Sequence, residues 1–207
     1  MCLALTYSFE VKSQPHSAKS EAAKIDKLTP FEDEETGLWG YKNGDGKIAI
    51  KPQYHIAFDF TGKIAAIGRK DGLYYIDGNG NILNIRPFIY DNGPDYFREG
   101  LARFTLATKT GFLNEHGEVV IDPLEFDFVS PFFDSLAVVC IGCAEVKEDE
   151  HNEHTSIAGG KWGYVDRQGH LTIPLKFDGA EPFDKGRARV LLNGEWIFVN
   201  RTGEVVD

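Results

Sequence analysis

Long apolar runs are absent from this chain of 207 residues. A transmembrane helix needs roughly 18 consecutive apolar residues, and since no stretch comes near that length, we expect no insertion into a membrane. Basic residues are also few, with 22 Lys and Arg against 32 Asp and Glu, so the formal net charge is −10. An acidic surface repels the phosphates of nucleic acids and anionic lipids. The negative charge of the chain argues against a nucleic-acid partner and favours a basic protein as the partner.

Cysteine occurs only three times, too rarely for a disulfide framework in a chain of this length, and the odd number leaves at least one thiol unpaired or intermolecular. The first nine residues lack the basic stretch with which a secretory signal begins. We therefore expect a cytoplasmic location for the chain as it stands, and a periplasmic or envelope location if a signal peptide precedes it. The cysteines do not choose between these compartments.

Motifs of known catalytic chemistry are lacking as well. The sequence has no His-Glu-x-x-His, no phosphate-binding P-loop, and no Ser or Cys in a nucleophile elbow. Asp77-Gly-Asn-Gly-Asn81 resembles the start of a calcium loop, but Ile82 and Phe88 stand where such a loop needs Gly and Glu. We expect a protein that is not an enzyme and holds no cofactor, with zinc as the one candidate considered below.

A short unit recurs along the chain. An aromatic residue is followed two positions later by Asn or Asp and three positions after that by Gly. Asx at the first position and Gly at the fourth are typical of a type I turn, in which the Gly adopts a left-handed conformation. Five copies carry the aromatic, Asx and Gly residues: Tyr41, Asn43 and Gly46; Tyr75, Asp77 and Gly80; Phe112, Asn114 and Gly117; Tyr164, Asp166 and Gly169; Phe198, Asn200 and Gly203.

Apolar positions on either side of these turns predict strands. Two residues after the glycine comes an apolar residue, which we expect on the buried face of an exit strand: Ile48, Ile82, Val119, Leu171 and Val205. Farther along, a Phe precedes an Ala by five positions, and the Ala opens another strand: Phe60 and Ala65, Phe97 and Ala102, Phe132 and Ala137, Phe183 and Ala188. Each unit thus has about three antiparallel strands.

The spacing of the turn glycines sets the domain organisation. They are 34, 37, 52 and 34 residues apart, so one gap holds an insertion of about 18 residues, predicted as a loop at about 144–160. Units of this size bury their apolar faces by stacking on neighbours. We expect one all-β array of four and a half repeats over residues 31–207. Residues 1–30 form an N-terminal segment with a short helix at 16–28, or a linker in its place.

The recurring motifs resemble those of the bacterial WG-repeat family. The resemblance is carried by Trp39-Gly40-Tyr41, Trp162-Gly163-Tyr164 and Ile50-Lys-Pro-Gln-Tyr54, together with the turns and the Phe and Ala positions, over about 175 residues. It implies an all-β antiparallel array without assigned catalytic residues. Similar proteins occur in the cell envelope and beside secreted toxins, where the resemblance implies an immunity role. Such a fold does not by itself set a function.

Three copies depart from the family pattern. Leu73 and Thr110 replace the Trp, and Tyr74 and Ile197 replace the Gly that follows it. We expect these copies to pack differently at that corner.

Cys140-Ile-Gly-Cys143, followed by His151 and His154, is the best metal-like pattern, because two thiolates and two imidazoles suit tetrahedral zinc. The Cys spacing fits a zinc site, but the two residues between the histidines are fewer than usual. A disulfide between Cys140 and Cys143, or free thiols, is the alternative reading.

The acidic insertion is the candidate recognition element, because insertions in repeat arrays emerge on one face. Its carboxylates suit a basic partner, although a charged stretch is also typical of a solvated loop. The candidate residues are Glu145, Glu148, Asp149, Glu150 and Glu153. The recurring aromatics either pack in the core or line a groove for carbohydrate or peptide. The sequence thus favours a non-catalytic protein-binding module, with immunity against a toxin as its sharpest form and binding of glycan or peptidoglycan in the envelope as the alternative.

Overall fold

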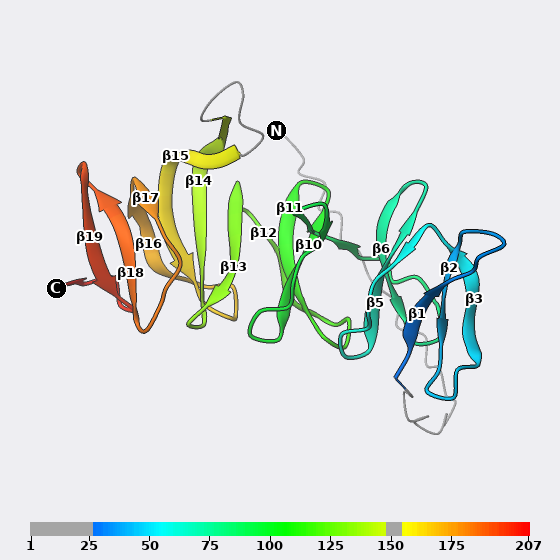
Figure 1. Ribbon diagram of the computed structural model, residues 1–207. Coiled ribbons are helices and arrows are strands. Elements are labelled where there is room, and N and C mark those ends of the chain that lie inside the picture. The colour runs from blue at the N-terminus through cyan, green and yellow to red at the C-terminus, as the bar shows by residue number, and fades with distance from the viewer. Residues whose placement is uncertain (1–26, 148–154) are drawn as a thin grey trace, which may run out of the picture.

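The computed structural model describes residues 27–147 and 155–207, and all of the regular secondary structure in these residues is strand. Antiparallel sheets follow one another in chain order and stand in an open row, with β1 to β3 at one end and β17 to β20 at the other (Figure 1). The all-β array predicted from the repeats is confirmed. The row does not close into a ring.

Five sheets have three or four strands each. The first contains β1 (Thr29–Glu32), β2 (Trp39–Lys42) and β3 (Ile48–Tyr54), and the second β4 (Ile56–Ala57), β5 (Ile64–Arg69) and β6 (Gly72–Asp77). The third contains β7 (Arg86–Pro87), β10 (Leu101–Leu106), β11 (Lys109–Asn114) and β12 (Val119–Leu124). The fourth contains β13 (Phe128–Phe133), β14 (Leu136–Lys147), β15 (Thr155–Val165) and β16 (Leu171–Phe177). The fifth contains β17 (Gly179–Ala180), β18 (Arg187–Leu192), β19 (Glu195–Asn200) and β20 (Val205–Val206), and a separate hairpin joins β8 (Ile89–Tyr90) to β9 (Gly93–Pro94).

The five predicted turns are confirmed. In the second copy, Asp77 Oδ1 accepts hydrogen bonds from the backbone N–H groups of Asn79 and Asn81, each at 2.9 Å. The N–H of Gly80 donates to the Asp77 carbonyl at 3.0 Å, and Gly80 has a φ of 83°. The other four copies repeat this geometry. The calcium-like segment is therefore a turn, because its carboxylate already bonds to its own backbone.

The exit strands bury fewer residues than the sequence suggests. The apolar residues two positions after each glycine are 42–65% exposed, so their predicted burial is wrong. Ile50, Ile121 and Ile173 are buried instead. A register shift separates the pair Lys42–Ile48 from the pair Tyr41–Ile50, and such a bulge interrupts the alternation that would otherwise place both isoleucines alike.

The Gly that follows Trp lies under the exit strand. A methyl group added to Gly40 would stand 2.5 Å from the carbonyl oxygen of Ile50. The same contact, with the carbonyl of Ile173, faces Gly163. Tyr74 and Ile197 replace this glycine in copies whose exit segment forms only an isolated bridge or the two-residue β20. Those two copies do pack differently, because no long exit strand crosses that corner. The copy with Thr110 packs like the regular ones, since Gly111 lies under the carbonyl of Ile121 in β12.

Each pair of neighbouring sheets shares one apolar layer. In β14, Ala137 and Val139 pack with residues of the third sheet, whereas Leu136, Val138 and Cys140 pack with residues of the fifth. Both faces of this strand are therefore buried, which explains its unbroken run of apolar residues. Equivalent layers join the first sheet to the second and the second to the third.

The end sheets bury one face only. In β18, Ala188 and Val190 are buried, while Arg187 and Arg189 alternate with them on the outer face. Their guanidinium groups lie over the rings of Phe198 and Trp196, at 4.6 and 4.7 Å from the centroids. At the other end, Lys42 lies 4.3 Å over Phe31. A cation therefore lies over an aromatic ring in each of the two end sheets.

The described part of the acidic insertion is paired strand. Residues Ala144 to Lys147 of β14 pair with Thr155 to Ala158 of β15, which extends the hairpin beyond the repeat. Residues 1–26 and 148–154 lie outside the described ranges. Most of the predicted N-terminal helix falls within residues 1–26. Over the described ranges, no helix has the length and apolar character needed to cross a bilayer.

Candidate functional site

The β8–β9 hairpin between the second and third sheets projects apolar side chains into solvent. Asp91 and Asn92 form its two-residue turn with φ angles of 48° and 64°, which is the geometry of a type I′ hairpin. Ile89 and Tyr90 are each 54% exposed, and Tyr96, just after the hairpin, is 62% exposed. Large exposed side chains gathered on one short element are a recognised feature of interaction sites.

A buried ion pair fixes the base of this hairpin. Asp95 Oδ2 accepts hydrogen bonds from Arg103 Nε at 2.8 Å and from the Arg103 backbone N–H, and Oδ1 accepts one from Nη2 at 2.9 Å. Arg103 Nη1 donates to the Val129 carbonyl of the next sheet at 3.0 Å. The guanidinium also stacks on Phe88, 4.0 Å from the ring centroid. With side-chain exposures of only 4% and 3%, this pair ties the hairpin to two sheets at once.

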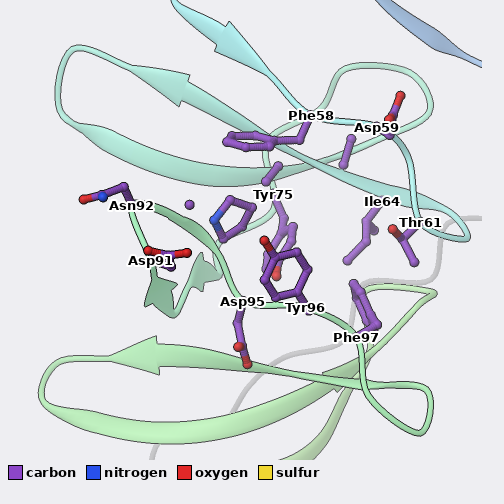
Figure 2. A pocket seen from close by; sticks show the side chains of 14 residues that line it. Phe58, Asp59, Thr61, Ile64, Tyr75, Asp91, Asn92, Asp95, Tyr96 and Phe97 are labelled. Atoms are coloured by element: carbon purple, nitrogen blue, oxygen red, sulfur yellow. The ribbon is translucent and has the colours of Figure 1, made fainter. Parts of the chain in front are cut away.

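One cavity, which we call the Tyr75 cavity, opens between the second and third sheets beside the hairpin (Figure 2). It has a volume of about 410 Å³, within the range of small-molecule and side-chain pockets. The rings of Phe58, Tyr75, Tyr96 and Phe97 line it, together with the carboxylates of Asp59, Asp91 and Asp95.

The hydroxyl of Tyr75 has no hydrogen-bond partner within the described residues, although the side chain is only 2% exposed. Burial raises the pKa of this phenol well above its usual value, and the negative charge of Asp95 raises it further. Tyr75 is therefore a neutral group at physiological pH, with hydrogen-bonding capacity that the described part of the chain does not use.

A second hollow, the Arg103 groove, lies on the other side of the hairpin. It has a volume of about 460 Å³ and is lined by Tyr90, Phe128, Phe133 and Arg103, among others. Glu145, on the extended part of β14, also lines this groove. The base of the acidic insertion and the exposed hairpin therefore border one shared surface.

The residues of the predicted zinc site are only partly described. Cys140 and Cys143, both in β14, are joined by a disulfide, which is the alternative considered beside zinc. His151 and His154 lie outside the described residues. No group of three or more metal-type ligands gathers within residues 27–147 and 155–207.

We expect Cys140 and Cys143 to resist alkylation in protein that is denatured without reductant, because a disulfide sulfur is not a nucleophile. Both should react after reduction. Peptide mass spectrometry measures this, with the denatured and reduced sample as the control for complete labelling. Alkylation of both cysteines before reduction, together with stoichiometric zinc by elemental analysis, would contradict the disulfide and favour the metal site.

The predicted acidic binding residues are described at one position only. Glu145 is exposed and pairs with Ile157 across the hairpin. The other four, Glu148, Asp149, Glu150 and Glu153, fall within residues 148–154, which are not described.

Most of the recurring aromatic residues belong to the core. Tyr41, Tyr75, Phe112 and Tyr164 are 0–2% exposed. Phe198 is the exception at 37%, since it belongs to the end sheet. Four of the five rings therefore fill the layers between sheets, and of these four Tyr75 also lines the Tyr75 cavity.

The hairpin and the two cavities were missed by sequence reasoning. One signal was present, because the spacing of 37 residues between Gly80 and Gly117 exceeds the usual 34 by three. Asn92-Gly93, between apolar residues, is a second signal, since Asn-Gly commonly marks tight hairpins. The Asp95–Arg103 pair has no such signal.

Comparison with known families gives one match. The sequence profile of a family described as WG containing repeat matches residues 39–74, 111–142 and 162–196. The hairpin at 89–94 and most of the acidic insertion lie between the matched segments. No curated protein matches the chain.

Proposed function

The chain belongs to the WG-repeat family, and from that premise we propose that it is a non-catalytic module that binds another protein. The single observation that carries the proposal is the exposed cluster of Ile89, Tyr90 and Tyr96 between two cavities. Tyrosines that present apolar surface beside concave pockets are the residues on which protein interfaces concentrate their binding energy. The repeat array supplies a rigid frame for this cluster.

A basic partner suits this surface. The net charge of −10 attracts a cationic protein during its approach. Glu145 borders the Arg103 groove, so the acidic insertion adjoins the exposed hairpin. The sharpest form of the proposal is an immunity-type role, in which the chain neutralises a secreted toxin of basic character. The resemblance to proteins found beside such toxins supports this form.

The proposal predicts that changing Ile89 to alanine weakens partner binding about fivefold, because an exposed interface side chain loses its buried area. The partner is first captured from cells on the immobilised chain and accepted only if it forms a stoichiometric complex in gel filtration. Its affinity for the variant is then measured by calorimetry.

Ile48→Ala is the matched control, since Ile48 is 56% exposed against 54% for Ile89 but lies in the first sheet. It should leave affinity unchanged. Equal effects of the two substitutions, or failure of the chain to form a stoichiometric complex with any cellular protein, would refute the proposed function.

A further inference from the structure

The repeats provide an internal comparison for the Tyr75 hydroxyl. Tyr41 donates a hydrogen bond to the carbonyl of Phe58 at 2.8 Å, and Tyr164 donates one to the carbonyl of Glu181 at 2.8 Å. Each acceptor lies 17 residues after its tyrosine. By strand pairing, the residue of the second copy that corresponds to Phe58 and Glu181 is Phe88, because Pro87 pairs in its sheet as Ala57 and Ala180 pair in theirs. The β8–β9 hairpin begins directly after Phe88, and the carbonyl of Phe88 accepts from the backbone N–H of Asp95 at 2.9 Å. The hairpin therefore uses the carbonyl that accepts from the tyrosine in the other copies.

The third copy shows that the hydroxyl is not needed for packing. Its aromatic residue is Phe112, which is 1% exposed and fills the same position without a hydroxyl. Tyr75 keeps a hydroxyl without any acceptor in the described chain.

The ring packing around Tyr75 differs in the same way. In three copies the recurring aromatic ring packs on the phenylalanine that follows it in the repeat. These pairs are Tyr41 with Phe60, Phe112 with Phe132 and Tyr164 with Phe183, with ring centroids 4.6–5.0 Å apart. Among the described residues, Tyr75 and Phe97 form no such pair, and both line the cavity between them. The Tyr75 cavity occupies the position of a ring contact that the other copies make.

The lining of the cavity suits a cation. Four aromatic residues and three aspartates line it, and none of its described lining residues is Lys, Arg or His. Asp95 is already neutralised by Arg103, whereas Asp59 and Asp91 are exposed and have no charge partner among residues 27–147 and 155–207. Aromatic faces attract ammonium and guanidinium groups, and unpaired carboxylates add to this attraction.

We propose that the Tyr75 cavity binds the side chain of a lysine or arginine from the protein partner. The methylene stem of that side chain packs between the rings of Phe58 and Phe97. Its charge lies near Asp59 and Asp91, and its N–H group donates to the neutral Tyr75 oxygen once the ring turns to uncover that buried atom. This inference rests on the proposed function, because it names what part of a basic partner enters the chain.

The experiment uses capped amino acids and therefore does not depend on finding the partner. Nα-acetyl-lysine methylamide and the arginine analogue are titrated into the full chain, and the methyl NMR signals of Ile64, Ala65 and Ala66 are followed. We expect saturable shifts of these signals with both cations, and none with the uncharged analogue of norleucine. Absence of saturation, or shifts confined to methyl groups elsewhere, would overturn the inference.

Tyr75→Phe should weaken binding of the capped lysine about tenfold, because it removes a hydrogen bond to a charged group. The variant should keep its melting temperature, since no protein bond is lost. Tyr164→Phe is the matched control: it removes the bond to the Glu181 carbonyl, so it should lower the melting temperature and leave binding of the capped lysine unchanged.

Unchanged affinity in Tyr75→Phe would overturn the assignment of the cavity. That outcome leaves capture of a partner through Ile89 and Tyr90 intact, so the failure of this inference is distinguishable from the failure of the proposed function.

Discussion

Replacing Asp95 with alanine is expected to lower the free energy of unfolding by about 3–5 kcal/mol, because it leaves the guanidinium of Arg103 buried without its counter-charge. The substitution removes all three hydrogen bonds that Asp95 accepts from Arg103. The remaining bond, to the Val129 carbonyl, does not neutralise the charge. Urea unfolding monitored by tryptophan fluorescence measures the loss.

Two variants separate the buried charge from other causes. In the double variant Asp95→Ala with Arg103→Met, no charge is stranded, so part of the lost stability should return. Asp178→Ala breaks an exposed pair with Lys161, whose side chains are 58% and 39% exposed, and it should hardly shift the unfolding midpoint. An Asp95 variant that unfolds at the wild-type midpoint would show that the pair contributes nothing.

Replacing Gly163 with alanine is expected to lower the free energy of unfolding by about 2–3 kcal/mol, the usual cost of overpacking a site that cannot relax. The added methyl group would meet the carbonyl oxygen of Ile173 and the backbone of Pro174. Neither atom belongs to a flexible side chain, so the exit strand β16 must move away from β15. Thermal unfolding followed by circular dichroism measures the effect.

Gly44→Ala is the control for Gly163→Ala, since nothing lies within 4 Å of a methyl group built there and its φ is not in the left-handed region. It should leave the melting temperature nearly unchanged. If both variants melt alike, close approach of the backbone does not explain why glycine follows tryptophan in this repeat.

The turns were predictable from the sequence because their chemistry is local. Asn43 and Gly46 need only their own backbone neighbours to form the hydrogen bonds of the turn, so a pattern six residues long contains the whole cause. The different packing at Tyr74 was predictable for a related reason: a side chain there is incompatible with a crossing exit strand. What the sequence could not give is the buried face of each strand, because the bulges shift the alternation by one residue.

The candidate site was less predictable because it depends on contacts between distant segments. Tyr75 precedes the same Asx and Gly turn as Tyr41, and only the pairing of distant segments shows that its hydroxyl has no acceptor among the described residues. Asp95 and Arg103 look like ordinary surface residues in the sequence, yet they are buried once three elements meet around them. The acidic insertion is recognisable in the sequence from its composition, whereas the exposed hairpin lengthens the repeat by only three residues.

Inner sheets bury both faces, whereas end sheets bury only one, and this difference limits how the array can be shortened. Removing β17 to β20 would uncover the layer that now holds Leu136, Val138 and Tyr164. Among the described residues, only the ring of Phe177 in that layer has a cation, Lys176, over it. Such a truncated chain would present a flat apolar surface through which copies would aggregate. The fifth sheet therefore keeps this layer out of water.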